Sequence, residues 1–360
     1  ITSGCGHVER VLGLSKDKTA LYFIATGNDP RARHVFKVNL DGSGLQQLTQ
    51  GNAVHSAAFA PDQKSWLHTT DQLGKPPQTV LEALDGTLEF AFPMFEHRLL
   101  KDIARRGPEL FTVTAGDGKT ELHAALYKPA HKGKAPLVVA VYGGPHVQVV
   151  RHSWALNADL RTQRLLDAGF YVLKVDNRGS SGRGIAFEKP VYGHLGEFEV
   201  DDQAAAVEQV LKRESGIDPA RVFVTGWSYG GYMTLMCLCR YPNVFKNGVS
   251  GAPVTSWAEY DAQYTERYMG TPQSNPEGYA KSAIMPYLRN MQAFPLLIHG
   301  MKDENVLFRH AGLLFEEAAR LNKLIYCLPL PRERHSATGR AARIYVEDQL
   351  FTYLCQQAGV

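Results

Sequence analysis

The sequence predicts an α/β domain that is preceded by an all-β segment, and three observations support this division. Before about residue 100, short β-type runs alternate with turn residues. From about Gly107, apolar strands alternate with helical patterns, which is typical of α/β proteins. Within that second part, a strand leads directly into the Gly-rich motif at residues 226–231, and an apolar helix leads directly out of it. We therefore expect two domains, residues 1–106 and residues 107–360.

The N-terminal segment carries a repeat. Leu40-Asp41-Gly42 returns as Leu84-Asp85-Gly86, and the turn at residues 14–17 returns loosely at residues 59–62. A period of ~40–50 residues with about four short strands is typical of propeller blades, although common turn residues also recur by coincidence. Because a propeller closes with roughly four to eight blades, we expect either the tail of a longer propeller or a sheet packed on the second domain. The expected strands are residues 20–25, 34–40, 44–49, 54–60, 65–70 and 79–84.

The second domain favours a largely parallel sheet covered by helices on both faces. Its first two strands, residues 108–115 and 120–128, are expected to form a hairpin. Polar residues and glycines follow several strands, where open α/β sheets place their sites. The other expected strands are residues 137–142, 170–175, 221–226, 248–251, 294–299 and 324–330, and the expected helices are residues 199–213, 232–240, 310–321 and 343–356.

The composition excludes several functional classes. A net charge of +3 is too small for a nucleic-acid or anionic-membrane footprint, and no apolar run approaches the ~18 residues of a membrane span. Five cysteines in a long chain do not indicate a disulfide scaffold, and Cys237 and Cys239 are expected to pack in a buried helix. The chain opens at Ile1 without an apolar leader, so we expect a signal peptide to be absent or lost with a missing N-terminus.

The chemistry is expected at Ser228, the central residue of Gly226-Trp227-Ser228-Tyr229-Gly230. The strand before this motif and the helix after it are the setting of a nucleophile elbow, whose tight turn strains the serine backbone and needs small neighbours. The turn lifts Oγ above the sheet and places the backbone N–H of Tyr229 at a helix N-terminus, ready to bind an oxyanion. A Gly-rich turn with an idle serine is the alternative.

A serine nucleophile needs a base, and the base needs an orienting carboxylate; in this fold they follow in the order Ser, acid, His. Asp303 comes first after the strand at residues 294–299 and is favoured over Glu304, which we expect to be a solvated loop charge. His335 lies in the loop after the next strand. The predicted triad is therefore Ser228, Asp303 and His335.

Two other histidines and one other loop bear on this site. His299 falls inside a strand and His310 at a helix start, so neither is expected over the elbow. The loop that begins at Tyr142 follows an early strand, and its Gly143 and Gly144 allow close approach, so its N–H groups or the Tyr142 hydroxyl are candidates for the second oxyanion donor. A buried tyrosine at the sheet edge is the alternative interpretation of Tyr142.

No cofactor is expected. The sequence contains neither an H-E-x-x-H motif nor a Cys/His cluster with the spacing of metal ligands. The only Gly-rich elbow is already assigned to Ser228, which leaves none for a nucleotide.

Several motifs resemble the dipeptidyl peptidase IV branch of the prolyl oligopeptidase family. They are GWSYGGYM, VYGGP, DNRGS, APVTSW, YTERYMG and DENV. The likeness covers residues 107–360, and residues 1–106 resemble the last blades of the propeller of that family. It implies an α/β-hydrolase domain and a serine exopeptidase that releases X-Pro or X-Ala dipeptides from free peptide N-termini through an acyl-enzyme.

The resemblance also implies residue roles. The triad agrees with the one derived above, and the Tyr142 hydroxyl joins the Tyr229 N–H in the oxyanion hole. Asn305 is implied to bind the carbonyl of the substrate's P2 residue, whereas Tyr268 is expected to be a packing residue. A shallow aromatic slot fits a pyrrolidine ring and excludes long side chains. The implied wall of this proline pocket is Tyr229, Val254, Trp257, Tyr260, Tyr264 and Val306.

The chain departs from the family in two respects. In the family, a pair of glutamates and an arginine bind the free α-amine and the P2 carbonyl of the substrate. Their part of the propeller lies upstream of residue 1, so we expect a C-terminal portion with a weak requirement for a free amine. Cys355 resembles one member of a family disulfide, but Asn247 stands at the partner position, so a free thiol is expected.

Other functions remain open at this stage. A prolyl tripeptidyl or oligopeptidase-type hydrolase, or an esterase, is the nearest alternative, and a binding module without catalysis is disfavoured because Ser228 and both partners are present. The expected partners are peptides with proline or alanine at the second position, with no nucleic acid, no membrane span and a homodimer as an option. A periplasmic or secreted location is favoured if the source is bacterial, with the cytoplasm as the alternative.

Overall fold

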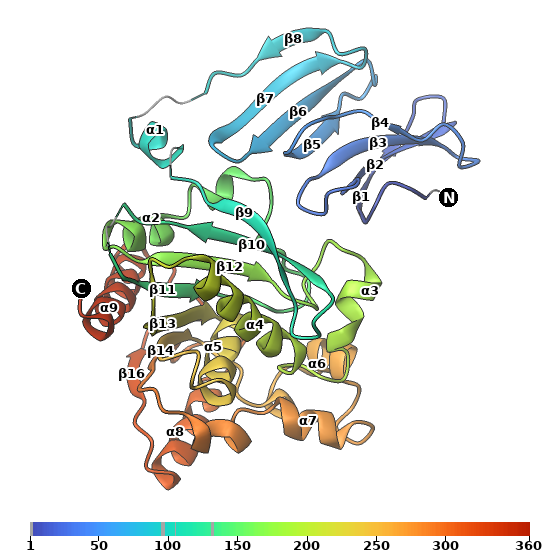
Figure 1. Cartoon of the computed structure of the whole chain (residues 1–360). Helices are drawn as coiled ribbons and strands as arrows, with labels where there is room; N and C mark the ends of the chain where they lie inside the picture. Colours follow the sequence, from blue (N-terminus) through green and yellow to red (C-terminus); the bar gives the residue numbers. More distant parts are fainter. Residues whose placement is uncertain (1–2, 95–97, 105, 131–132) are drawn as a thin grey trace. The chain divides into compact units, whose positions relative to one another are not determined.

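The computed structural model describes residues 3–94, 98–104, 106–130 and 133–360 (Figure 1). Contacts divide the chain into two compact units. The first holds Ile1–Pro108, Val150–Gln163 and Ser181–Ile185, and the second holds Glu109–Val149, Arg164–Ser180 and Ala186–Val360.

The described residues of the first unit form two antiparallel sheets of four strands each, as expected for blades (Figure 1). Phe23 and Phe36 stack between neighbouring strands of the first sheet, with ring centroids 5.5 Å apart. The sheet orders are β1 (Val8–Leu14), β2 (Ala20–Ala25), β3 (His34–Asn39), β4 (Gln46–Gln47), and β5 (Val54–Phe59), β6 (Ser65–Gln72), β7 (Lys75–Ala83), β8 (Leu88–Ala91), with the helix α1 (Arg98–Ala104) afterwards.

The second unit is built on a mixed eight-stranded sheet, which confirms the predicted α/β class. The two strands at one edge pair with each other in antiparallel fashion, and the inner one of them pairs antiparallel with the rest of the sheet. The other six strands are mutually parallel. The sheet order is β16 (Tyr326–Leu330), β15 (Leu296–Gly300), β14 (Asn247–Gly251), β13 (Ile217–Trp227), β11 (Ala135–Ala140), β12 (Tyr171–Asp176), β10 (Glu121–Tyr127), β9 (Glu109–Thr114). Because the chain turns back between β12 and β13, β11 and β13 form a topological switch point, where open sheets of this kind bind ligands.

Helices pack on this sheet. The helix α5 (Tyr229–Arg240) is buried from its first residue to Cys239, which includes Cys237, and it contacts β13, β14 and the helix α4 (Phe198–Arg213). Cys355 is a free thiol in the last helix. The helices are α2 (Leu160–Asp167), α3 (Ile185–Glu188), α4 (Phe198–Arg213), α5 (Tyr229–Arg240), α6 (Ala262–Met269), α7 (Pro276–Ser282), α8 (Arg309–Arg320) and α9 (Arg340–Ala358).

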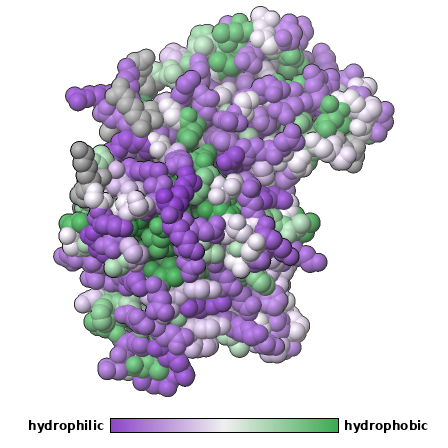
Figure 2. Space-filling view, viewed as in Figure 1, coloured by the Kyte–Doolittle hydropathy of each residue, from purple (hydrophilic) through white to green (hydrophobic). Residues whose placement is uncertain are grey.

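Figure 2 shows one face of the molecule. The face in Figure 2 is mostly hydrophilic, with separate small apolar patches. Within the described part of the chain, no helix is both long and apolar enough to cross a membrane.

Candidate active site

Ser228 stands between the end of β13 and the start of α5, in a strained conformation. Its φ is 59° and its ψ is −118°, a region that residues other than glycine rarely occupy. Its backbone N–H donates to the carbonyl oxygen of Gly251 at 2.8 Å, and its side chain makes no capping hydrogen bond to the helix. The elbow therefore holds this hydroxyl out of the secondary structure, as a nucleophile requires.

The glycines around Ser228 are required by close packing. A Cβ on Gly226 or on Gly230 would overlap the carbonyl oxygen of Val141, at the end of β11. A Cβ on Gly231 would overlap the carbonyl oxygen of Gly251, at the end of β14. The motif thus reflects the space between three neighbouring strands, and it brings the loop after β11 against the elbow.

The predicted acid and base lie on two loops that are joined to each other. Met301 and Lys302 lie in the loop after β15. The N–H of Met301 donates to a carbonyl oxygen at the end of β16, and the N–H of Lys302 donates to one in the loop after β16, each at 3.0 Å. A Cβ on Gly300 would overlap a backbone carbonyl of that loop, so the two loops approach closely. As a result, His335 Nδ1 lies 2.8 Å from Asp303 Oδ2, which leaves Nε2 to face a nucleophile.

Asp303 is held as a carboxylate. Its side chain is fully buried, and its Oδ1 accepts from the N–H groups of Asn305 and Val306, each at 2.9 Å. Burial by itself would raise the pKa of Asp303, but the hydrogen bonds from His299, His335 and the backbone hold that pKa well below its usual range. An acid that stays ionised can orient an imidazole and stabilise its charged form.

Asp303 has a charged neighbour on its own loop and a histidine neighbour in β15. Glu304 is exposed and pairs with Arg334 at 2.9 Å, in keeping with its expected role as a solvated loop charge. His299 lies inside β15, as expected, but its Nε2 is also 3.3 Å from Asp303 Oδ2 and 2.8 Å from the carbonyl oxygen of Val306. The sequence did not point to this contact, which makes His299 a second support of the carboxylate.

The His335 loop is also tied to the elbow. The indole N–H of Trp227, the residue before Ser228, donates to the carbonyl oxygen of His335 at 2.7 Å. Among the described residues, the Ser228 hydroxyl and the His335 ring are not hydrogen-bonded to each other. The structure therefore joins Asp303 to His335 and brings the base loop to the nucleophile loop, while the full triad stays a prediction.

The side chains of Tyr142 and Tyr229, the two predicted oxyanion residues, lie together. Their ring centroids are 6.1 Å apart, and a Cβ on Gly144 would lie 2.5 Å from the Tyr229 ring. Burial raises the pKa of Tyr142, so its hydroxyl stays protonated and able to donate. The N–H of Tyr229 is among the first of α5, which a helix leaves without an intrahelical acceptor. Both groups are hydrogen-bond donors, and their part in an oxyanion site stays a prediction.

The residues expected in the proline pocket form an aromatic cluster around Trp257. The Trp257 ring lies 5.3 Å from Tyr229, 5.7 Å from Tyr260 and 6.0 Å from Tyr264. The Tyr260 hydroxyl donates to Asn305 Oδ1 at 2.6 Å. The two valines are buried, and Tyr268 packs against the ring of Tyr264, in keeping with its expected packing role. The two valines of this set are Val254 and Val306, whereas Tyr268 lies beside the set as a packing residue.

Glu199, in the first turn of α4, is a site residue that sequence reasoning missed. It is fully buried, and its Oε1 accepts from the Tyr229 hydroxyl at 2.5 Å and from the N–H of Gly196 at 3.0 Å. Burial raises the pKa of Glu199 to about 7. In the sequence it is one acid among several at the start of a helix, where acids are common on solvated surfaces.

We expect Glu199→Gln to change how stability depends on pH. The native pKa lies above the unfolded one, so the native state binds more protons between pH 4.5 and 7, and the wild type loses stability as pH rises through that window. The substituted glutamine side chain keeps the acceptor oxygen and cannot ionise. The variant should therefore gain about 2–3 kcal/mol in unfolding free energy over the wild type between pH 5 and pH 8.

Urea unfolding at the two pH values measures this difference. Burial raises the pKa values of the neighbouring Tyr229, Tyr232, Tyr264 and Cys237, so these groups stay neutral throughout, and Asp202 is paired with Arg178. Glu208→Gln, on the exposed side of the same helix, is the matched control and should show no such trend. A pH-independent difference for Glu199→Gln would contradict the prediction.

Comparison with known proteins matches both parts of the chain. Residues 156–360 match the model of the prolyl oligopeptidase family, and residues 1–77 match that of the dipeptidyl peptidase IV (DPP IV) N-terminal region. Human dipeptidyl peptidase 8 is 38% identical over 355 residues, which are 94% of this chain and 39% of that protein. These matches confirm the predicted fold, an α/β-hydrolase domain preceded by a propeller segment.

Two solved structures have a fold similar to that of this chain. A putative dipeptidyl aminopeptidase IV from Bacteroides ovatus has a TM-score of 0.90 at 29% identity and covers 98% of this chain. Porphyromonas gingivalis dipeptidyl peptidase 4 has a TM-score of 0.89 at 27% identity and covers 99%. The match takes up 50% of each of those two chains, so this chain spans about half of their length.

Proposed function

Because the chain belongs to the prolyl oligopeptidase family, we propose that it is a serine peptidase that releases X-Pro or X-Ala dipeptides from peptide N-termini. The observation that carries this proposal is the 2.8 Å contact of His335 with Asp303, on a loop bonded to the residue before the strained Ser228. A chemically idle elbow would not need a buried, ionised acid aligned with a histidine.

The proposed mechanism has two steps. His335 Nε2 takes the proton of Ser228 Oγ as Oγ attacks the carbonyl carbon of the proline residue, and Asp303 stabilises the imidazolium that forms. The Tyr142 hydroxyl and the Tyr229 N–H stabilise the tetrahedral oxyanion. The C–N bond then breaks, the leaving amine takes the proton from His335, and water hydrolyses the acyl-enzyme by the same proton route.

The aromatic cluster supports selectivity for a small ring. Tyr260 and Tyr264 are partly exposed and pack against the buried ring of Trp257, so their rings suit a compact apolar side chain such as proline. Asn305 receives the Tyr260 hydroxyl at Oδ1, which leaves its amide N–H groups as donors for the carbonyl of the P2 residue. Position and chemistry thus favour a dipeptide with proline second.

Hydrolysis of chromogenic amides tests this function. We expect this chain to cleave a Gly-Pro amide with a kcat/KM more than about 10-fold above that for a Gly-Leu amide, because the cluster discriminates by shape. Free Gly-Pro should appear as the product. Cleavage of an Ala-Ala-Pro amide in place of Gly-Pro would instead indicate a tripeptidyl peptidase, and an inert, folded chain would refute the proposal. An N-acetylated Gly-Pro amide, run beside the free one, measures whether a free amine is needed.

A further inference from the structure

A stripe of buried polar side chains lies on α4 and takes no part in the chemistry proposed above. Glu199, Asp202 and Gln203 are spaced so that they share one face of the helix, and none of the three is exposed to solvent. Burying carboxylates is costly unless they are paired and hydrogen-bonded. The partners of this stripe therefore indicate what the burial supports.

The first member holds the elbow. Glu199 accepts from the Tyr229 hydroxyl at 2.5 Å, and Tyr229 is the residue whose backbone N–H is the proposed first oxyanion donor. The Tyr229 ring is thus held at its hydroxyl end by Glu199 while it packs 5.3 Å from the Trp257 ring. With the side chain held in this way, the first residue of α5 has little freedom to turn its N–H away from Ser228.

The third member holds the other half of the site. Gln203 donates from Nε2 to Asn177 Oδ1 at 2.8 Å and to the carbonyl oxygen of Val175 at 3.1 Å. Asn177 in turn donates from Nδ2 to the carbonyl oxygen of Gly143 at 2.8 Å, the residue after Tyr142. The Asn177 side chain thereby links Gln203 to the loop that carries the proposed second oxyanion donor.

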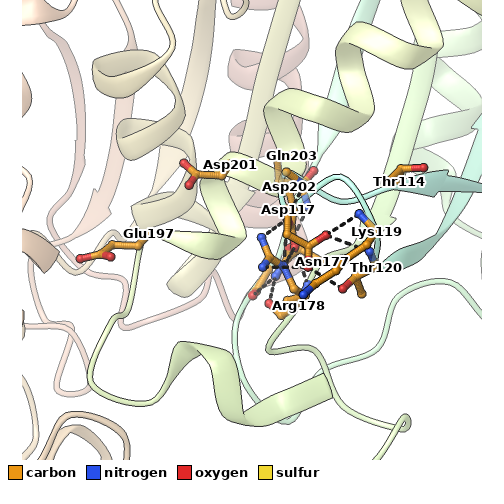
Figure 3. Close-up of polar contacts among 12 residues, drawn as sticks. Thr114, Asp117, Lys119, Thr120, Asn177, Arg178, Glu197, Asp201, Asp202 and Gln203 are labelled. Atoms are coloured by element: carbon orange, nitrogen blue, oxygen red, sulfur yellow. Dashed lines mark hydrogen bonds and ion pairs between the residues drawn. The ribbon is translucent and has the colours of Figure 1, made fainter. Parts of the chain in front are cut away.

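The second member fixes the segment between these contacts (Figure 3). The Asp202 carboxylate receives Nε and Nη2 of Arg178, the latter at 2.7 Å, together with the Arg178 backbone N–H at 2.9 Å. Its Oδ1 also accepts from the N–H of Gly116 at 2.9 Å, and Asp117 lies 3.3 Å from Arg178 Nη1. Because Arg178 follows Asn177 directly, Asn177 is held in place from both sides.

We propose that this stripe of α4 positions both donors of the oxyanion hole. The stripe consists of Glu199, Asp202 and Gln203. It therefore contributes to stabilisation of the transition state and has little effect on the affinity for substrate. The inference rests on the proposed function. These are positioning residues: none touches the reacting atoms, and each acts through Tyr229, Arg178 or Asn177. Preorganised donors are needed where charge develops, and a displaced donor loses much of its effect.

The test compares variants of α4 in this chain. Glu199→Ala and Gln203→Leu remove the two supports, and Glu199→Gln keeps an acceptor for Tyr229. Gln209→Leu is the matched control: it lies on the same helix and exchanges two hydrogen bonds, of 2.7 and 2.9 Å, with the backbone of Thr114 on β9, away from the site. Each variant is assayed for kcat and KM on a Gly-Pro amide.

The same variants are assayed for binding of two ligands. A Gly-Pro boronate forms a tetrahedral adduct in which Ser228 Oγ bonds to boron, and the dipeptide Gly-Pro is bound as a ground-state ligand. We expect Glu199→Ala and Gln203→Leu to lower kcat roughly 10- to 100-fold, less than the ~10²–10³-fold of removing a donor, and to weaken the boronate by a similar factor. Binding of Gly-Pro and KM should change less than about 3-fold, and Glu199→Gln should restore most of kcat.

Other outcomes would overturn the inference. Equal losses for the boronate and the dipeptide, or a loss in Gln209→Leu as large as in Gln203→Leu, would indicate general structural damage. Wild-type values in Glu199→Ala and Gln203→Leu would show that the donors need no such support. An inert wild-type chain would refute the proposed function itself, and the inference with it.

Discussion

Replacing Ser228 with alanine is expected to lower kcat on a Gly-Pro amide by at least about 10⁴-fold. The proposed acyl-enzyme cannot form without Oγ, and only the rate enhancement that comes from binding and the oxyanion site is left. The fold should persist, because the Ser228 side chain caps nothing and alanine tolerates the same backbone with the same Cβ. Steady-state kinetics and thermal unfolding of the two proteins measure these effects.

Ser336→Ala is the control for this experiment. Ser336 is exposed and follows His335 in the same loop, so the change removes a nearby hydroxyl without touching the elbow. It should leave kcat within about 2-fold of the wild type, as surface substitutions commonly do. If Ser228→Ala retained more than a hundredth of the activity, another group would have to be the nucleophile.

Replacing Asp303 with asparagine is the second large expected effect, a fall in kcat of about 10⁴-fold with little change in KM. The asparagine oxygen can still accept backbone N–H groups, so the loop should keep its shape. Its amide, however, cannot stabilise an imidazolium, and it favours the wrong tautomer of His335. The measurement is kcat over pH 6–9, together with a fluorophosphonate probe that reports how readily Ser228 reacts.

The neighbouring acid gives the matched comparison for that change. Glu304→Gln removes a charge one residue away, but Glu304 is exposed and pairs only with the exposed side chain of Arg334 among the described residues. It should cost less than about 2-fold in kcat, since exposed ion pairs contribute little. Equal losses in the two variants would mean that the loop responds to charge in general and that Asp303 has no special role.

The division into β-blades and an α/β domain was predictable because it depends on periodicity. Strands such as β2 and β3 are largely buried and show clear apolar runs, whereas β1 and β8 are mostly exposed and gave no such signal. The helix α5 begins at Tyr229, three residues earlier than expected. Gly230 and Gly231 look like breakers in the sequence, and only the packing of the strands explains why glycine is needed there.

The site residues divide in the same way. The contact between Asp303 and His335 was predictable because both residues follow strand ends in a known order, and those positions do not depend on side-chain detail. Glu199 and Asn177 were not, because an acid at a helix start and an asparagine after a strand are common surface residues. The structural roles of Glu199 and Asn177 depend on their burial and on hydrogen-bond partners that are distant in the sequence. These partners are Tyr229 and Gly143, and no local sequence pattern indicates them.

The hydrogen bond from the Trp227 indole to the His335 carbonyl gives the candidate active site an intrinsic spectroscopic probe. Trp227 is one of only four tryptophans in the chain, and its N–H is bonded to the backbone of the proposed base. An indole proton resonance or a fluorescence signal from this residue is therefore an intrinsic reporter of site assembly. It would register the departure of the histidine loop with no substrate, label or turnover.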